Sequence, residues 1–323
     1  MILTVTLNPL LERRLFFHSV ELGKELRASN EVFSAGGKGI NVSRQLNLLG
    51  MKNSAFTFLG GNNGKILRNI LTEEKIDFTV QSSKSETRSA DLIIEENPFR
   101  VTTFFGVNSI ITKEEAEEFK HKLDKMIQNC SVVIFSGSSP CKATDDIFPY
   151  GIELANKYDK ISILDTYGNH LKKCIDATPT VIHNNLHELK NSLEENFSIE
   201  NGIRNYMYSL NSKGIRLIFL TDGANPFYAS KFDFHYKIYP PKVYTIDATG
   251  SGDAFVAGLA YGLEKSLVFE DFLKRATALG ALNAANLETC KVKPEESEKL
   301  MDLVSIEPIG KKMKVIDDSP NYL

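Results

Sequence analysis

The chain of 323 residues lacks the sequence features that are typical of several large functional classes. Its four cysteines lie far apart and form no Cys-x-x-Cys pair, which predicts free thiols and argues against a disulfide framework or a zinc knuckle. A formal net charge of -3 leaves no basic field for nucleic acid. No apolar run approaches a membrane span, and the N-terminus lacks the basic leader of a signal peptide. We therefore expect a cytoplasmic protein that binds neither nucleic acid nor membrane.

Two common phosphate-binding motifs are also missing. The Walker pattern requires Gly-Lys followed by Ser or Thr, whereas Gly37-Lys38 is followed by Gly39. The dinucleotide fingerprint requires a third glycine three residues after the second, and Phe255 stands at that distance from Gly252. Neither class of nucleotide site is predicted.

One stretch nevertheless has the chemistry of an anion site, namely Gly250-Ser251-Gly252-Asp253 followed by small and apolar residues. The glycines predict a tight turn that enters a helix, whose first N–H groups point outward and attract a phosphoryl group. A carboxylate would repel that phosphate, but it makes sense as a base that takes a proton from an attacking hydroxyl. Alternatively, Asp253 is an ordinary first-turn acid and Gly-Ser-Gly an ordinary loop.

The rest of the chain alternates between apolar strands and helix-like segments. With 42% hydrophobic and 24% charged residues it has an ordinary globular composition. Polar residues follow the strands, as at the ligand-binding edge of a doubly wound, mainly parallel α/β sheet flanked by helices. The strands are predicted at residues 2–7, 54–59, 131–135, 161–164, 180–182 and 215–220.

Two predicted hairpins stand apart from this alternation, and together they suggest a β lid. With no linker and no repeat in the sequence, we expect a single domain over residues 1–323, with lid strands inserted at about 12–34 and 87–106. An exposed apolar lid face would pair with a partner subunit in a homodimer, or it would fold over its own site.

Several short motifs then occur in a fixed order along nearly the whole chain. They are Thr6-Leu7-Asn8-Pro9, Ala35-Gly36-Gly37-Lys38-Gly39-Ile40-Asn41-Val42, Gly60-Gly61-Asn62-Asn63-Gly64, Thr87-Arg88, Ser136-Gly137-Ser138, Asn185-Leu186-His187-Glu188 and Thr249-Gly250-Ser251-Gly252-Asp253. In this order they resemble the PfkB/ribokinase family of carbohydrate kinases, within it the hexose-phosphate branch. The resemblance implies a ribokinase-like fold with a β lid, and transfer of the γ-phosphoryl group of ATP to a sugar alcohol.

The resemblance also implies roles for the residues around the transferred group. Asp253 would be the catalytic base, and the amides of Gly250, Ser251 and Gly252 would form an anion hole. Asp165, in a segment similar to the family's Asp-Thr-Ser-Gly, is expected to shape the site rather than react.

Asn185 and Glu188 match the family's Asn-x-x-Glu, which helps to hold Mg²⁺, often through water. The alternative is a transition-metal cluster of His183, His187 and Glu188. Because His183 lies at a predicted strand end, a shared helical face with His187 is doubtful.

For the sugar side, Lys38 and Arg88 are the candidate ligands of a phosphate already carried by the substrate, and Ser138 would add a hydroxyl. Gly37 and Asn41 are expected to contact sugar hydroxyls. A lone cation is otherwise a surface charge, and Asn41 could instead bond locally in its helix.

Nucleotide contacts are expected from Thr221, Gly223 and the small-residue helix at 276–286. In that helix Ala278, Gly280 and Ala281 would permit close approach of a flat ring, and Asn283 would lie near the adenine. Tight helix packing without a ligand explains the same composition.

Several positions depart from the family pattern. Glu12 stands where the family has an aspartate that grips sugar hydroxyls, and His183-Asn184 replaces Lys-Pro. Pro226 stands at a position where glycine is usual. The first departure bears on the identity of the sugar, and the others bear on nucleotide and metal affinity.

These observations predict an ATP- and Mg²⁺-dependent kinase of a ketohexose monophosphate. The first choice of substrate is fructose 1-phosphate, giving fructose 1,6-bisphosphate, with tagatose 6-phosphate and fructose 6-phosphate as alternatives. A kinase of ribose or nucleosides would not need Lys38 with Arg88. A sugar-phosphate-binding regulator without turnover is a further alternative, suggested by Glu12 and Pro226.

Overall fold

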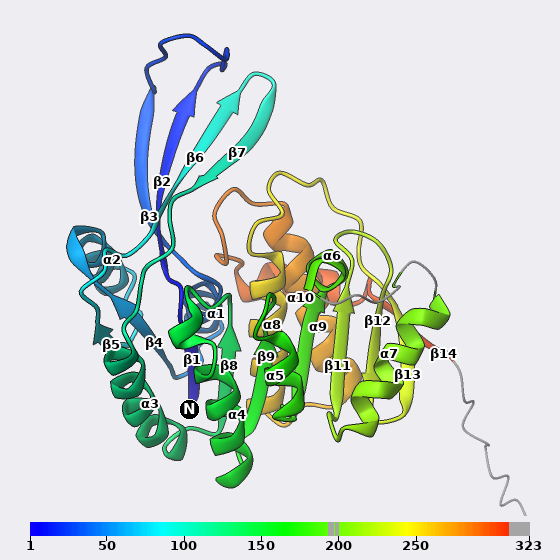
Figure 1. The fold of residues 1–323 in the computed structure, drawn as a ribbon. Coiled ribbons are helices and arrows are strands. Elements are labelled where there is room, and N and C mark those ends of the chain that lie inside the picture. The colour runs from blue at the N-terminus through cyan, green and yellow to red at the C-terminus, as the bar shows by residue number, and fades with distance from the viewer. Residues whose placement is uncertain (193–196, 198–199, 310–323) are drawn as a thin grey trace, which may run out of the picture.

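The computed structural model describes residues 1–192, 197 and 200–309 (Figure 1). In these ranges one sheet of 10 strands forms the centre of the molecule, in the order β14-β13-β12-β11-β10-β9-β8-β1-β4-β5. Its strands are β1 Ile2–Thr6, β4 Asn53–Leu59, β5 Phe78–Ser82, β8 Val132–Ser136, β9 Ile161–Asp165, β10 Val181–Asn185, β11 Leu217–Thr221, β12 Phe227–Lys231, β13 Phe234–Tyr239 and β14 Ser305–Ile309.

From β5 to β11 the strands are parallel. They read as continuous apolar runs because helices cover both faces, and every residue of β1 is buried. In β1, Leu3 pairs with Ser54 of β4 on one side and with Val133 of β8 on the other. The predicted doubly wound α/β sheet is therefore confirmed. Strand β5 and the antiparallel strands β12, β13 and β14 were not predicted from the sequence.

Helices pack on both faces of this sheet (Figure 1). One apolar cluster joins the sheet to α3 Lys113–Gln128, α4 Ile147–Lys157, α5 Leu171–Asp176, α6 Leu186–Ser192 and α7 Glu200–Ser212. The cluster on the other face includes α1 Lys38–Leu48, α8 Ser251–Glu264 and α9 Phe269–Ala284, and α10 Pro294–Met301 packs against α9. The helix α2 Gly61–Glu73 packs on β4 and on the base of the lid, and a short 3-10 turn, η1, covers Lys142–Thr144.

A second sheet of four strands projects from the body as a narrow blade (Figure 1). Its order is β3-β2-β6-β7, with β2 Leu10–Phe17, β3 Asn30–Gly36, β6 Ser89–Glu96 and β7 Phe99–Phe105. The hairpins β2–β3 and β6–β7 join through a parallel pairing of β2 with β6. Strand β2 starts directly after Asn8-Pro9, so Glu12 lies at the base of this lid.

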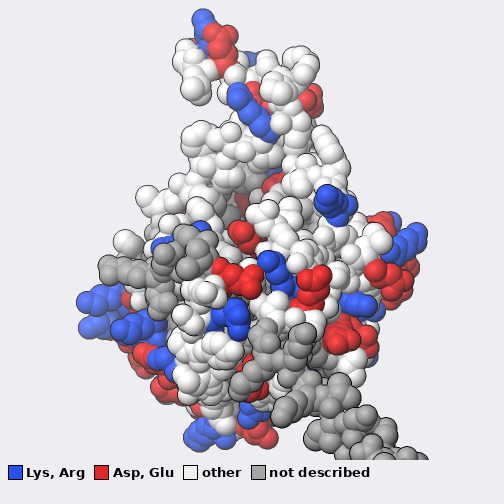
Figure 2. Space-filling model, turned by 90° about the vertical axis from the view of Figure 1, so that its right-hand side faces the viewer, with Lys and Arg blue, Asp and Glu red and all other residues white. Residues whose placement is uncertain are grey.

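The surface and the cysteines agree with the composition. Acidic and basic side chains are intermixed over the face shown in Figure 2, below the lid. All four cysteines are free thiols. Within the described ranges, no helix combines the length and apolar character needed to span a bilayer.

Candidate active site

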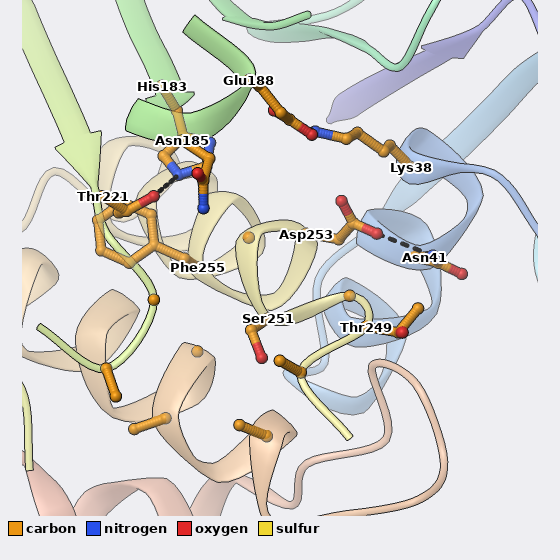
Figure 3. Close-up of a pocket in the computed structure, with 18 of the residues that line it drawn as sticks. Lys38, Asn41, His183, Asn185, Glu188, Thr221, Thr249, Ser251, Asp253 and Phe255 are labelled. Atoms are coloured by element: carbon orange, nitrogen blue, oxygen red, sulfur yellow. Dashed lines mark hydrogen bonds and ion pairs between the residues drawn. The ribbon is translucent and has the colours of Figure 1, made fainter. Parts of the chain in front are cut away.

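A cavity of about 780 Å³ lies where the base of the lid meets the carboxyl edge of the sheet. Figure 3 shows side chains from α1, β10, β11, α6 and α8 pointing into it. The cavity brings together most of the residues predicted from the sequence: Glu12, Gly37, Lys38, Asn41, Arg88, Asn185, Glu188, Thr221, Gly223, Gly250, Ser251, Gly252 and Asp253. Ser138 and Asn283 are not in its lining.

The turn at Gly250 forms the floor of the site. Gly250 has the left-handed φ of 79° and is the N-cap of α8, with no side chain capping the helix. In the described part of the chain, the amides of Gly250 and Gly252 have no hydrogen-bond acceptor, whereas the amide of Ser251 donates to Ala248 O at 3.1 Å. The Thr289 methyl group fills the space where a Cβ of residue 250 would lie. Unpaired amides at the start of a helix are a site for an anion.

Asp253 lies in the first turn of α8 and is only 4% exposed. Asn41 Nδ2 donates to Asp253 Oδ2 at 2.8 Å (Figure 3). Burial raises the pKa of Asp253 to about 7, and the Asp165 carboxylate adds to this while the Lys38 ammonium opposes it. A carboxyl group with a pKa near neutrality is suited to accept a proton from a hydroxyl and return it.

Lys38 lies between two carboxylates. Its Nζ is 3.4 Å from Asp165 Oδ1 and 3.1 Å from Glu188 Oε1. Burial works against the charge on Lys38, but these carboxylates and Asp253 outweigh it and hold the pKa of Lys38 well above its ordinary value. Lys38 is thus charged and lies near the candidate base. It was predicted to bind a sugar phosphate, but in the structure its ammonium group is already paired with Asp165 and Glu188.

Asp165, the buried partner of Lys38, is fully shielded from solvent and does not itself line the cavity. It also accepts hydrogen bonds from Ser136 Oγ at 2.8 Å and from His183 Nδ1 at 3.0 Å. Burial disfavours its ionised form, but Lys38, His183 and Ser136 outweigh burial and hold the pKa of Asp165 well below its usual range. These contacts suit the positioning role predicted for Asp165, which stays a prediction.

Arg88 lines the cavity and stands directly before the lid strand β6. Its guanidinium donates to Asn8 O at 3.1 Å and to Asn108 Oδ1 at 3.5 Å, and in the described residues no carboxylate pairs with it. Burial lowers the pKa of Arg88, and the electrostatic interaction with Tyr167 opposes this decrease. Ser138 Oγ accepts from Asn8 Nδ2 at 3.1 Å, so it contacts the same asparagine whose carbonyl accepts from Arg88. An unneutralised guanidinium at a cavity wall is a ready partner for a phosphate group.

Asn185, at the end of β10, and Glu188, in α6, both line the cavity. Asn185 Oδ1 also accepts from the His187 amide at 2.8 Å. A carboxylate with an amide suits a hard cation such as Mg²⁺ that keeps much of its water. His183, in contrast, is engaged by Asp165 and by Thr221 Oγ1 at 3.1 Å. Among the described residues, no group of three or more His, Cys, Asp or Glu is placed to hold a metal ion, which removes support from the alternative histidine cluster.

Of the three small residues predicted to face the nucleotide, Gly280 and Ala281 line the cavity and Ala278 does not. Thr277, Gly280, Ala281 and Ala284 share one face of α9 and line the cavity. Ala278 is instead fully buried in the core.

Asn283 is also fully buried. Its Nδ2 donates to Thr249 O at 2.8 Å, and its Oδ1 accepts from the Cys290 amide at 2.7 Å. Asn283 therefore braces the turn before α8 and does not reach the cavity.

Further lining residues were missed from the sequence, or were not assigned to the site. Tyr167 lies with its ring centroid 5.2 Å from Lys38 Nζ. The loop that follows β13 contributes a second group of lining residues. Its two adjacent prolines, which come directly after a strand, were the sequence feature that could have indicated this loop. The missed residues include Leu10, Phe105, Ala224, Phe227, Pro240, Pro241, Lys242, Val243 and Thr245.

Known proteins are similar to this chain in both sequence and fold. Residues 12–296 match the pfkB family carbohydrate kinase. The chain is 30% identical over 311 residues to tagatose-6-phosphate kinase of Staphylococcus epidermidis, covering 95% of this chain and 99% of that protein. The structure of a possible 1-phosphofructokinase from Thermotoga maritima has a TM-score of 0.87 at 24% identity, covering 96% of this chain and 99% of that one. Phosphofructokinase-2 from Escherichia coli has a TM-score of 0.87 at 21% identity, covering 94% and 98%. Together with the fold and the site, the family match over most of its length establishes that the chain belongs to the pfkB family of carbohydrate kinases.

Proposed function

We propose that the protein transfers the γ-phosphoryl group of ATP to a hydroxyl group of a ketohexose monophosphate. The observation that carries this proposal is the joining, in one cavity, of Asp253, the uncapped start of α8 and the unneutralised Arg88. A base, an anion hole and a second phosphate ligand are what a sugar-phosphate kinase requires. An uncharged acceptor such as ribose would leave the charge of Arg88 without an anionic partner.

The residues divide the reaction among themselves. Asp253 takes the proton of the acceptor hydroxyl while the oxygen attacks the γ-phosphorus, and ADP leaves. The free amides of Gly250 and Gly252 stabilise charge on the transferred group, and Lys38 neutralises charge from the opposite side. A magnesium ion held by Asn185 and Glu188, largely through water, would balance the phosphates of ATP.

The nucleotide would lie along the wall of the cavity that α9 forms. The face of α9 that lines the cavity carries only small residues there, which leaves room for a flat ring. Thr221, Gly223 and the 240–243 loop would enclose the ribose and the phosphates. Asn283 has no part in this contact, because its amide group is used inside the protein.

For the acceptor we propose fructose 1-phosphate first, with formation of fructose 1,6-bisphosphate. Tagatose 6-phosphate is the next candidate, supported by the name of the relative with 30% identity, and fructose 6-phosphate follows. The C1 and C6 arms of a ketofuranose extend from opposite sides of the ring oxygen, so one phosphate ligand and one base can serve either arm.

The test is ADP release measured with fructose 1-phosphate, fructose 6-phosphate, tagatose 6-phosphate, ribose and adenosine as acceptors. We expect turnover of at least one ketohexose phosphate and none of ribose or adenosine. Turnover of ribose alone would contradict the proposal. Calorimetric binding of a sugar phosphate without ADP release would support a non-catalytic regulator instead.

We also propose that the lid forms a homodimer. Its outer strands expose large apolar side chains, which are Val32 and Phe33 on β3 and Phe99, Phe104 and Phe105 on β7. In the strand register Phe33 and Phe104 lie on one face of the lid sheet, and Val32, Phe99 and Phe105 lie on the other. Exposed apolar side chains on edge strands suit pairing with a second copy. Light scattering after gel filtration should give the dimer mass for the wild type and the monomer mass for Phe104→Asp. A monomeric wild type would refute the dimer.

A further inference from the structure

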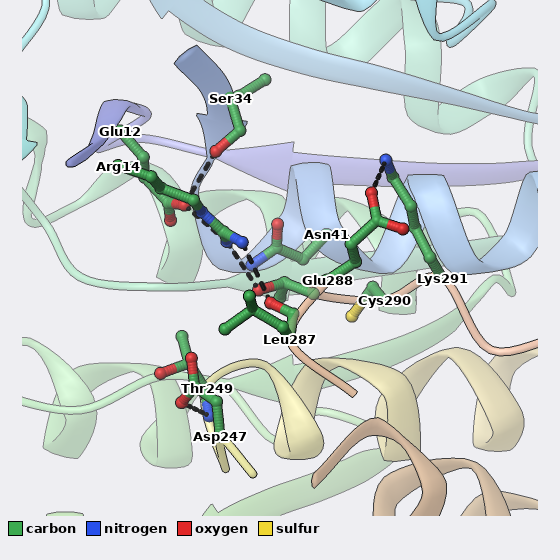
Figure 4. Close-up of polar contacts among 12 residues, drawn as sticks. Glu12, Arg14, Ser34, Asn41, Asp247, Thr249, Leu287, Glu288, Cys290 and Lys291 are labelled. Atoms are coloured by element: carbon green, nitrogen blue, oxygen red, sulfur yellow. Dashed lines mark hydrogen bonds and ion pairs between the residues drawn. The ribbon is translucent and has the colours of Figure 1, made fainter. Parts of the chain in front are cut away.

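Arg14 connects the lid to a distant segment of the body. It lies on β2, is 8% exposed, and its Nη1 donates to Leu287 O at 3.0 Å. Its Nη2 donates to Glu12 Oε2 at 3.1 Å and to Thr289 Oγ1 at 3.2 Å (Figure 4). One guanidinium therefore holds a lid carboxylate and the 287–289 segment together.

The carboxylate that Arg14 holds faces the sugar end of the cavity. Glu12 lines the cavity and is 5% exposed, and its Oε2 also accepts from Ser34 Oγ at 3.0 Å. Gly36 leaves room for this longer acid, because a Cβ at position 36 would lie 2.5 Å from Glu12 Oε1. The extra methylene of Glu12 is thus accommodated, and the position of its carboxylate is fixed by Arg14 and Ser34.

The segment on the other side of Arg14 touches the anion hole. The Thr289 methyl group packs against Gly250, and Cys290 Sγ donates to Gly250 O at 3.4 Å. The Cys290 amide donates to Asn283, which in turn donates to Thr249 O. The backbone of the turn before α8 therefore rests on the segment that Arg14 holds.

We propose that Arg14 is a positioning residue that fixes the sugar-facing Glu12 and the anion-hole turn relative to each other. The inference rests on the proposed kinase function. Hydrogen bonds to a buried carboxylate are among the stronger ones in proteins, and their loss leaves that charge poorly compensated. Without Arg14, Glu12 relaxes toward water, and the Thr289 contact with Gly250 loses its support. Both acceptor binding and the rate of transfer should therefore fall.

The neighbouring arginine provides a matched control. Arg13 lies on the same strand, is 43% exposed in its side chain, and pairs with Asp91 at 2.7 Å on the lid. Arg13 does not line the cavity, and it takes no part in the contact with the 287–289 segment. Arg13→Met removes the same charge from the same strand without touching Glu12 or Thr289.

The experiment compares Arg14→Met, Arg14→Lys, Arg13→Met and Thr289→Val with the wild type, using the acceptor from the panel with the highest turnover. Arg14→Met should lower kcat/KM for the acceptor by roughly tenfold or more, through both a higher KM and a lower kcat, while KM for ATP stays nearly unchanged. Arg14→Lys should recover part of this loss. Thr289→Val, which keeps a methyl group beside Gly250 and deletes the hydroxyl, should lower kcat with little change in the acceptor KM.

The double variant Arg14→Met with Thr289→Val gives the decisive comparison. If both act on one contact, its kcat is no lower than that of Arg14→Met alone. Arg14→Met kinetics equal to those of Arg13→Met would overturn the inference and leave the kinase function standing. If Arg14→Met fails to fold, Thr289→Val decides, and an unchanged kcat overturns the inference. A wild type that turns over none of the ketohexose phosphates overturns the function, and the inference falls with it.

Discussion

Asn41 and Asp253 are joined by a 2.8 Å hydrogen bond although they stand 212 residues apart in the chain. Asn41 comes from α1 and Asp253 from α8, two helices that pack against each other. The amide favours the ionised carboxylate, whereas burial favours the protonated one, and burial is the larger effect. This contact fixes the orientation of the candidate base and limits the rise of its pKa.

Asp253→Asn should lower kcat by about 10²–10⁴ because the acceptor proton then has no base. The acceptor should still bind, since Glu12 and Arg88 are intact. The measurement is ADP release together with calorimetric binding of the sugar phosphate, and Asp302→Asn on the surface is the control. An Asp253→Asn enzyme with wild-type kcat would remove Asp253 from the mechanism.

The same substitution should stabilise the protein at neutral pH. The pKa of Asp253 is about 7 in the folded state against an ordinary 3.8, so the folded chain holds a proton that the unfolded chain releases between these values. Stability contributed by this group is therefore lost as pH rises from about 4 to about 7. The Tm of Asp253→Asn should exceed that of the wild type by a margin that grows over this window. An equal margin at pH 4 and pH 8 would contradict this account.

Asn41→Ala should move the acid limb of the pH–rate profile to higher pH. It removes the donor that stabilises ionised Asp253, so a larger fraction of the base stays protonated near neutrality. The profile of kcat/KM between pH 5 and pH 9 measures the shift. Asn47→Ala, further along α1 and bonded to Lys75 and Asn53, should leave the profile in place.

Arg88→Gln should weaken binding of a phosphorylated acceptor selectively. Loss of a charge-assisted contact predicts a rise of roughly tenfold or more in the acceptor KM. Residual activity on the unphosphorylated ketohexose, if present, should not change. Arg100→Gln on the lid is the matched control, because Arg100 is exposed and pairs with Glu95. A similar KM in both variants would rule out Arg88 as the phosphate ligand.

Gly250→Ala should impair both stability and turnover. A φ of 79° costs an L residue about 1–2 kcal/mol, and the added Cβ collides with the Thr289 methyl group. Adding Thr289→Ser to Gly250→Ala should relieve the collision while keeping the hydroxyl that accepts from Arg14. Part of the lost Tm should then return, as measured by calorimetry. No recovery would mean that backbone strain alone accounts for the defect.

The sequence was most informative where function depends on a few adjacent residues. The glycine turn at 250–252 and the start of α8 are local features, and the structure has them where they were predicted. The parallel strands were visible as apolar runs with polar ends. Of the antiparallel strands, β12 and β13 are short and joined by a turn, and β14 follows only after α8, α9 and α10. These strands carry no comparably distinct signal in the sequence.

Long-range contacts could not be predicted in the same way. Small residues identified α9 as a helix that tolerates close approach, but they did not give its rotation, which places Ala278 in the core and Gly280 at the cavity. The role of Asn283 depends on Thr249 and Cys290, and the charge balance of Lys38 depends on Asp165 and Glu188. Such partners are decided by packing and not by sequence spacing.

The lining of the cavity runs in sequence from Leu10 to Ala284, and it draws on the lid, α1, β10, β11, α8 and α9. No half of the chain contains both Asn41 and Asp253. Fragments cut in the loops between them would each lack one wall, and neither would retain a partial activity. We therefore expect this chain to turn over substrate only when its whole fold is complete.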